Sequence, residues 1–151
     1  KYFNFNYISG LKDIENSDLK KKNILLAIGS RFLNDTASYY LNCGANVFTR
    51  VLPTHQSVSA ALASCIRNSN IAILEPSRTR ETFIEKKLCD FWHIDYVLCR
   101  ESGSYSQKNW EDIVYGSKMQ LFLVKRPKLK HYNSYLFFEY DSLIKHIREK
   151  Y

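Results

Sequence analysis

The amino-acid sequence predicts an α/β fold in three layers, with helices on both faces of a mostly parallel sheet of about five strands. From residue 23 onward, short runs rich in Ile, Val and Leu alternate with segments of helical periodicity, as in repeated βα units. Most of these runs are apolar throughout, which is typical of strands covered on both faces. The length of 151 residues and a hydrophobic content of 45% suit one domain with a sizeable core.

The predicted strands are runs of six or seven residues that end at a Gly, a Pro or a basic residue. Pro53, Pro76 and Pro127 each follow such a run closely and indicate sharp turns. A shorter run over residues 135–138 predicts an edge strand. The five main strands are expected over residues 23–28, 46–52, 70–75, 94–99 and 119–124.

The clearest predicted helix lies between the second and third of these strands. Val58, Ala61, Leu62, Cys65 and Ile66 follow the spacing i, i+3, i+4, i+7, i+8, which places five apolar side chains on one helical face. Four other stretches carry a less regular apolar stripe beside charged residues. These helices are expected over residues 32–41, 81–92, 109–116 and 141–150.

Residues 1–22 differ in composition from the rest of the chain. Aromatic residues alternate with asparagine from Phe3 to Tyr7, which predicts a short strand or arm, and a polar stretch then leads to three lysines at positions 20–22. We expect residues 1–22 to be an N-terminal arm or interdomain linker and residues 23–151 to be the α/β domain. Since the sequence lacks an initial Met, we expect a trimmed chain or a fragment of a longer one.

The formal net charge of +7 predicts anionic partners, such as phosphates, polycarboxylates or nucleic acid. No apolar run approaches the roughly 20 residues of a membrane-spanning helix, and the first ten residues lack the apolar core of a signal peptide. We therefore expect a cytoplasmic protein with no membrane partner.

The four cysteines are expected to be buried free thiols and not metal ligands. They are scattered without a CxxC pair, and each lies among apolar residues. No histidine has typical ligand spacing from a cysteine pair, so no metal site is expected. The cysteines are Cys43, Cys65, Cys89 and Cys99.

Candidate binding residues follow the predicted strands, because ligands of open parallel sheets bind beyond the carboxyl ends of the strands. No residue is singled out as catalytic, since both a Gly-x-Ser-x-Gly elbow and an activated Cys–His context are absent. The candidates are Gly29, Ser30, Arg31, Pro53, Thr54, Glu75, Pro76, Ser77, Arg78, Arg100, Glu101, Ser102, Gly103 and Arg126.

Each of these loops also has a plain structural interpretation. Gly29 permits close backbone approach and Arg31 can bind a carboxylate or phosphate through two hydrogen bonds, but the same residues suit a tight turn with a solvated arginine. Thr54 can cap the next helix or stand beside an anion. The loop from Arg100 to Gly103 can grip a polar ligand or simply form a polar turn. A full G-x-G-x-x-G fingerprint is absent.

In sequence order, the strand-end segments resemble the C-terminal domain of the precorrin-6A (precorrin-6x) reductases of cobalamin biosynthesis. The resemblance covers roughly residues 23–151 and depends on the order and spacing of five segments, none of which is specific alone. These segments are Ile24-Leu25-Leu26-Ala27-Ile28-Gly29-Ser30, Arg50-Val51-Leu52-Pro53-Thr54, residues 70–77, residues 92–103 and residues 121–127.

The resemblance implies a Rossmann-like domain that forms one wall of a cleft in a two-domain, NADPH-dependent oxidoreductase. This enzyme class reduces a CH–CH bond of precorrin-6A, or of its cobalt form, so an anionic tetrapyrrole, NADPH and a missing N-terminal domain are the implied partners. Residues 1–22 would then be the interdomain crossover. The isolated chain is expected to be inactive.

Two departures from the family pattern affect what can be carried over. The family often has Gln-Gly-Pro-Phe where this chain has Leu74-Glu75-Pro76-Ser77, and a Lys in the loop where this chain has Arg100. Since arginine keeps its proton, Arg100 suits anion binding and not proton donation.

The alternative function is a non-catalytic basic α/β module that binds nucleotide or nucleic acid. The net charge of +7 and the content of 11 Tyr and 9 Phe favour it. Most of these aromatics fall within predicted strands and helices, where core packing accounts for them. Nucleic acid is therefore the less favoured partner.

Overall fold

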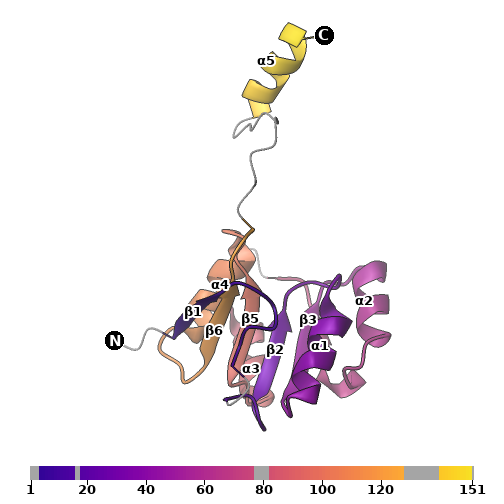
Figure 1. Ribbon diagram of the computed structural model, residues 1–151, viewed down its shortest axis with the longest axis vertical. Helices are drawn as coiled ribbons and strands as arrows, with labels where there is room; N and C mark the ends of the chain where they lie inside the picture. The colour runs from indigo at the N-terminus through magenta and orange to yellow at the C-terminus, as the bar shows by residue number, and fades with distance from the viewer. Residues whose placement is uncertain (1–3, 16–17, 77–81, 128–139, 151) are drawn as a thin grey trace.

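A computed structural model describes residues 4–15, 18–76, 82–127 and 140–150. Its centre is a six-stranded sheet in the order β1-β6-β5-β2-β3-β4, in which every neighbouring pair is parallel (Figure 1). The predicted α/β fold with a mostly parallel sheet is thus confirmed. The strands are β1 (Phe5–Ile8), β2 (Asn23–Ala27), β3 (Asn46–Val51), β4 (Ile71–Ile73), β5 (Tyr96–Arg100) and β6 (Gln120–Val124).

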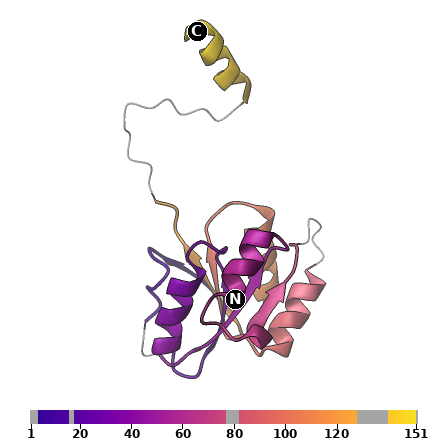
Figure 2. The same cartoon turned by 90° about the vertical axis from the view of Figure 1, so that its right-hand side faces the viewer.

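Helices cover both faces of the sheet. The helices are α1 (Leu33–Asn42), α2 (His55–Leu62), α3 (Phe83–Phe91), α4 (Tyr105–Val114) and α5 (Tyr140–Lys150), with a short 3-10 helix at Asn68–Asn70. Figure 2 shows α1, in purple, and α3, in pink, on opposite sides of the sheet. Buried residues of α1 and α2 belong to one core cluster, while those of α3 and α4 belong to the other. The predicted three layers are therefore present.

Strand β2 is buried on both faces, which explains its unbroken apolar sequence. Ile24 and Leu26 lie in the core cluster beneath α1 and α2, whereas Leu25 lies in the cluster beneath α3 and α4. All three side chains are fully buried. Successive residues of a strand point to opposite faces, so only a run without polar interruptions suits this position.

The N-terminal segment contributes a sixth strand to the sheet. Phe5 pairs with Leu121 and Ile8 with Val124, so β1 lies parallel to β6 at the edge of the sheet. The Asn4 amide donates to the carbonyl of Ser117 at 2.8 Å and strengthens this pairing. The predicted edge strand over residues 135–138 lies outside the described residues.

Two helices differ from their predicted bounds by more than two residues. Helix α2 ends at Leu62, although the apolar pattern continues to Ile66. The backbone N–H of Cys65 instead donates to the Asn34 side chain at 3.0 Å, and the Ser64 hydroxyl donates to the carbonyl of Ala61 at 2.6 Å. These contacts replace the next helical turn. Helix α4 begins at Tyr105, one turn before the predicted start. The prediction began too late because the first turn of this helix is mostly polar and carries no apolar stripe.

The chain order creates a switch point between β2 and β5. From the central strand β2, the chain proceeds outward to β3 and β4, and it then returns to β5 on the other side of β2. The loops after β2 and β5 consequently lead in different directions from adjacent strands. Such a position is where open α/β sheets bind ligands.

Candidate functional site

The loop after β2 contains a glycine whose conformation few other residues adopt. Gly29 has φ +81°, and a Cβ atom added to it would have no neighbour within 4 Å. The glycine is therefore required by its backbone conformation and not by crowding. The open space around it leaves room for close approach of a ligand. The loop then closes onto helix α1 through a hydrogen bond from Leu33 N–H to the carbonyl of Ser30.

Phe32 brings the arginines of two loops together. The guanidinium carbon of Arg31 lies 5.2 Å from the centroid of the Phe32 ring, and that of Arg100 lies 5.1 Å from the same centroid. Both distances are in the range of cation–π interactions. Among the described residues, neither guanidinium has an acidic partner or a side-chain hydrogen bond. The arginines from β2 and β5 therefore meet at the switch point.

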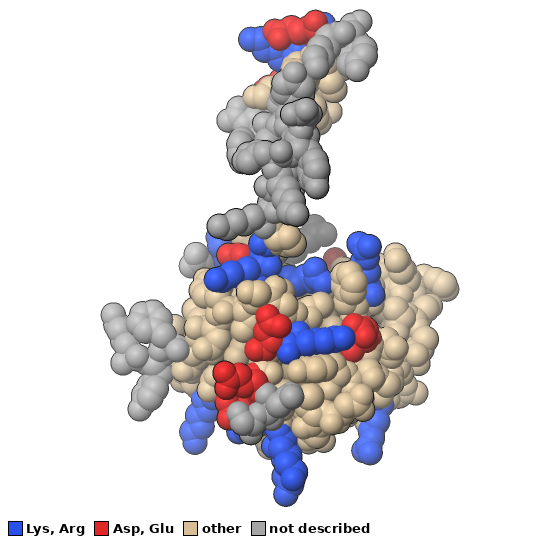
Figure 3. Space-filling view, viewed as in Figure 1, with Lys and Arg blue, Asp and Glu red and all other residues tan. Residues whose placement is uncertain are grey.

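Basic side chains lie at the end of the domain where the strands terminate, and others project from the opposite end. Figure 3 shows Lys and Arg side chains along the upper edge, close to where the chain leaves β6. Arg100 is the last residue of β5, Arg31 follows β2, and Lys125 and Arg126 follow β6; all four are exposed. Since parallel strands all end at the same edge, these charges reinforce one another and attract anions.

The loop after β5 is organised by a side chain of helix α4. The Gln107 side-chain oxygen accepts hydrogen bonds from the backbone N–H groups of Ser102, at 2.7 Å, and Gly103, at 2.8 Å. The hydroxyls of Ser102 and Ser104 are also 2.6 Å apart. The Ser102 and Gly103 amides are therefore already satisfied within the protein. Gly103, with φ +64°, gives the loop its sharp turn.

Arg126 ties the loop after β6 to the loop after β5. Its Nε donates to the carbonyl of Glu101 at 3.0 Å, and a terminal nitrogen donates to the carbonyl of Ser102. Its backbone N–H donates to the Glu101 carboxylate at 3.2 Å. The Arg126 side chain therefore holds the two loops together. Arg31 and Arg100 are more available than Arg126 to bind an anionic ligand.

The remaining candidate residues lie on the other side of β2. The Thr54 hydroxyl accepts a hydrogen bond from the backbone N–H of Ser57 at 3.3 Å, so this residue is the N-cap of α2, and Pro53 precedes it. Glu75 and Pro76 follow β4, which β3 separates from β2. Two further candidates, Ser77 and Arg78, lie outside the described residues.

Sequence reasoning missed a buried arginine in β3, the strand beside β2. Arg50 of β3 is 8% exposed, and its guanidinium lies 5.8 Å from the Trp110 ring and 3.4 Å from the Ser106 hydroxyl. Burial lowers the pKa of Arg50, whereas the negative charge of the buried Glu85 opposes that change. A charged residue beside the apolar residues Val47, Phe48 and Val51 of a predicted strand was the available signal. The resulting cluster joins β3, α3 and α4.

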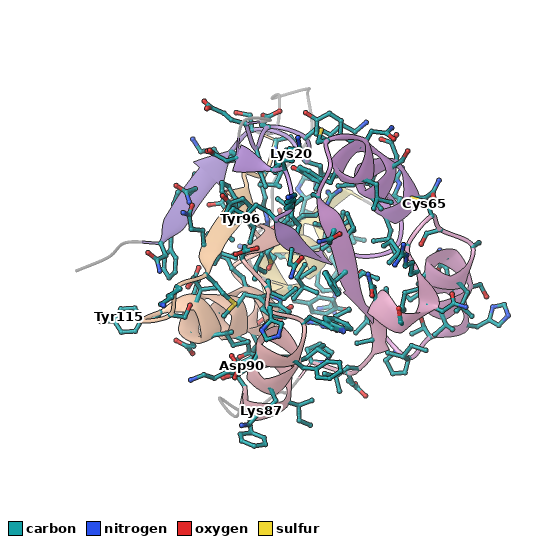
Figure 4. The ribbon with its side chains drawn as sticks, turned by 90° about the horizontal axis from the view of Figure 1, so that it is seen from below. Lys20, Cys65, Lys87, Asp90, Tyr96 and Tyr115 are labelled. Carbon is teal, nitrogen blue, oxygen red and sulfur yellow. The ribbon has the colours of Figure 1, made fainter. Side chains whose placement is uncertain are left out.

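The four cysteines fall into two classes. Cys89 and Cys99 are buried as predicted, while Cys43 is partly exposed and Cys65 is exposed, contrary to the prediction. Figure 4 places Cys65 at the rim of the domain. Among the described residues, no group of three or more His, Cys, Asp or Glu side chains could hold a metal ion. In the same residues, no helix is long and apolar enough to cross a membrane.

Comparisons with known proteins agree with this fold. A sequence model of the family described as precorrin-6x reductase CbiJ/CobK matches residues 4–148. Cobalt-precorrin-6A reductase from Synechocystis sp. is 31% identical over 86 residues, which are 57% of this chain and 31% of that protein. The solved structure of CobK precorrin-6A reductase has a TM-score of 0.60 at 11% identity, covering 87% of this chain and 51% of that one.

These comparisons show which family the chain belongs to and how much of each relative it matches. The chain spans about half of the solved CobK chain and about a third of the Synechocystis protein. The family match begins in the segment that contains β1 and continues into α5. It therefore includes all of the strand-end loops described above. The chain belongs to the precorrin-6x reductase CbiJ/CobK family.

Proposed function

We propose that this chain is the C-terminal domain of a reductase that acts on precorrin-6A, or on its cobalt form, with NADPH as the electron donor. The proposal rests on one observation above all: Arg31 and Arg100 meet on Phe32 at the switch point of the sheet. Two guanidiniums to which the described residues give no acidic partner suit a ligand that carries several carboxylates. The family membership supplies the reaction class.

The residues after β2 fit the phosphate groups of a dinucleotide. Gly29 leaves open space at its Cβ position, and helix α1 begins at Leu33 without a side-chain cap on its first amides. The Leu33 N–H is bonded to the Ser30 carbonyl, but the next amides of this first turn have no side-chain cap, and amides at a helix N-terminus favour an anion. When bound, NADPH supplies the hydride that reduces one macrocycle double bond, and a proton completes the product.

The protein's own contribution is to bind and orient the substrate. Arg31 and Arg100 would neutralise substrate carboxylates, and the loop braced by Gln107 and Arg126 would hold Arg100 in place. Arg100 keeps its proton at physiological pH, so we assign it to anion binding. No described side chain is assigned as the proton donor.

The second wall of the cleft would come from an N-terminal domain. We propose that residues 1–22 include the crossover from that domain, with β1 anchoring it to the sheet edge. On this view the isolated chain binds ligand weakly and does not turn over. A cytoplasmic location follows from the proposed biosynthetic role.

The proposal is tested by comparing this chain with a version extended by its natural N-terminal neighbour. Both are titrated with precorrin-6A and NADPH while macrocycle absorbance and nicotinamide oxidation are followed. We expect turnover by the extended protein, with loss of at least tenfold in kcat/KM for Arg31→Ala or Arg100→Ala, on the order of one charge-assisted hydrogen bond. An extended protein that neither binds nor reduces precorrin-6A would contradict the proposal.

The net charge of +7 also favours a second candidate, a non-catalytic module for nucleotide or nucleic acid. Such a module would bind mixed-sequence oligonucleotides with steep salt dependence. Arg31 and Arg100 contact one ring and do not form a stripe, which makes this the weaker candidate.

A further inference from the structure

Phe32 is an exposed aromatic residue in a place where packing does not require one. Its side chain is 41% exposed, and it precedes α1 as the N-cap residue without forming a side-chain cap. An aromatic ring is not a favoured N-cap, because it offers no oxygen to the first amides of the helix. The position therefore calls for an explanation other than helix formation.

The ring has two cations as neighbours. Arg31 approaches from the same loop and Arg100 from the end of β5, each within 5.2 Å of the ring centroid. Two like charges beside one ring repel each other, and the described residues provide neither of them with an acidic partner. The electron-rich ring of Phe32 is the contact that the two guanidiniums share.

We propose that Phe32 is a positioning residue that presents the guanidiniums of Arg31 and Arg100 as one site for a pair of anionic oxygen groups on a single ligand. This inference deepens the proposed function and rests on it for the identity of the ligand. The paired groups are two carboxylates if the ligand is the tetrapyrrole, and phosphates if it is the dinucleotide. Phe32 itself takes no part in the chemistry.

A ligand with two anionic groups would reduce the repulsion between the Arg31 and Arg100 guanidiniums, because it places a negative charge beside each of them. Each guanidinium can donate two parallel hydrogen bonds to a carboxylate or phosphate. Because the ring already restricts both side chains, less rotamer freedom is lost when they bind. Leucine at position 32 would retain an apolar contact but lose the attraction for the cations, whereas tyrosine would retain the ring.

The first experiment tests the site without reference to any reaction. NMR spectra of the full chain are recorded for the wild type, Phe32→Leu, Phe32→Tyr and the control Phe91→Leu, which removes a 77% exposed ring from α3. Side-chain resonances of Arg31 and Arg100 should carry ring-current shifts in every protein except Phe32→Leu. Unshifted resonances in the wild type would overturn the proposal.

Inorganic pyrophosphate is then titrated into the same samples. Both arginines should respond together, and Phe32→Leu should weaken the apparent affinity about fivefold, as expected from the loss of cation–π contacts. Phe32→Tyr and Phe91→Leu should stay within about twofold of the wild type on that same scale. Equal affinity in Phe32→Leu, with a changed Tm only, would assign Phe32 a structural role and overturn the inference.

The same series with uroporphyrin, an octacarboxylate, and with NADPH identifies the source of the anions. A fivefold loss in Phe32→Leu for one of these ligands only, on the scale of the same contacts, assigns the site to carboxylates or to phosphates. A wild type that binds pyrophosphate through both arginines but neither larger ligand would support the site and contradict the proposed function. The two proposals therefore fail separately.

Discussion

At the scale of single residues, the arginines divide into structural and available ones. Arg50 is buried against Trp110 with Glu85 as a compensating charge, and Arg126 is bonded to backbone carbonyls of the neighbouring loop. Arg31 and Arg100 are exposed and lie beside the Phe32 ring, and the described residues form no ion pair with either of them. Sequence alone could not separate these roles, because all four follow or occupy strand ends.

The buried thiols make stability depend on alkaline pH. Burial raises the pKa of Cys89 to about 12, and it raises that of Cys99 to about 11 even though Arg50 partly opposes the change. An unfolded thiol has a pKa near 9.0. Between pH 9 and pH 11 the unfolded chain therefore releases protons that the folded chain keeps, and stability falls as pH rises by up to about 1.4 kcal/mol per pH unit for each thiol.

Urea unfolding at several pH values between 8 and 11, for the wild type and Cys99→Val, measures this effect. Valine fills a similar apolar site and does not titrate. We expect a shallower decrease for the variant, whereas Tyr40 and the lysines should affect both proteins equally. Parallel profiles would mean that Cys99 ionises as readily when folded as when unfolded.

At the scale of elements, helix ends were harder to predict than helix positions. Helix α1 was expected over residues 32–41 and lies at Leu33–Asn42, because its apolar stripe spans its full length. The apolar pattern of α2 extends beyond the last residue of the helix. Ile66 is buried although it lies in the following loop, which hydrogen bonds to the side chains of Asn34 and Ser64 stabilise. Those contacts are tertiary, so periodicity could not reveal them.

Gln107 is the side chain on which the loop after β5 depends. It accepts from two loop amides and donates to Glu111 at 2.7 Å. Gln107→Ala should reduce the free energy of unfolding by about 0.5–1.5 kcal/mol, since it removes the acceptor of one partly buried and one exposed amide. Amide exchange at Ser102 and Gly103 should accelerate in the same variant.

The matched control for this prediction is Gln120→Ala. Gln120 is exposed and accepts one longer bond, at 3.3 Å, from the amide of Asn6. We expect its replacement to change the free energy of unfolding by less than about 0.5 kcal/mol. Equal effects of the two substitutions, or unaltered exchange at Ser102, would show that the loop does not depend on Gln107.

At the scale of the whole molecule, the sequence predicted which segments form strands better than it predicted how the strands are arranged in the sheet. Runs such as 23–28 and 119–124 were located to within two residues because strands buried on both faces are apolar throughout. Strand β1 was harder, since it has four residues and pairs with a strand more than a hundred residues away. Strand order depends on such distant pairings, which local patterns do not encode.

The same reason limits what sequence could say about the site. The loops after β2 and β5 were both expected to bind ligand, and the fold places them at adjacent strands. Their contact through Phe32 depends on that adjacency, so Phe32 was predicted only as the start of a helix. The β4 loop, also a candidate, lies two strands from β2. Grouping the candidates required the strand order.

The net charge of +7 leads to a final prediction, which separates a focused anion site from general basicity. If binding depends on the overall charge, affinity for a mixed-sequence single-stranded oligonucleotide should fall steeply between 50 and 200 mM KCl, with a slope of about −0.7 for each phosphate neutralised. Arg31→Ala combined with Arg100→Ala would then lower the magnitude of that slope by only about 1.4, because other lysines and arginines remain.

If binding depends on the switch point, the same double variant should lose most of its affinity for precorrin-6A at either salt concentration, while its oligonucleotide affinity changes little. Fluorescence anisotropy and macrocycle absorbance measure the two affinities on the same samples, and a double variant that still binds precorrin-6A as tightly as the wild type would remove the switch point as the binding site.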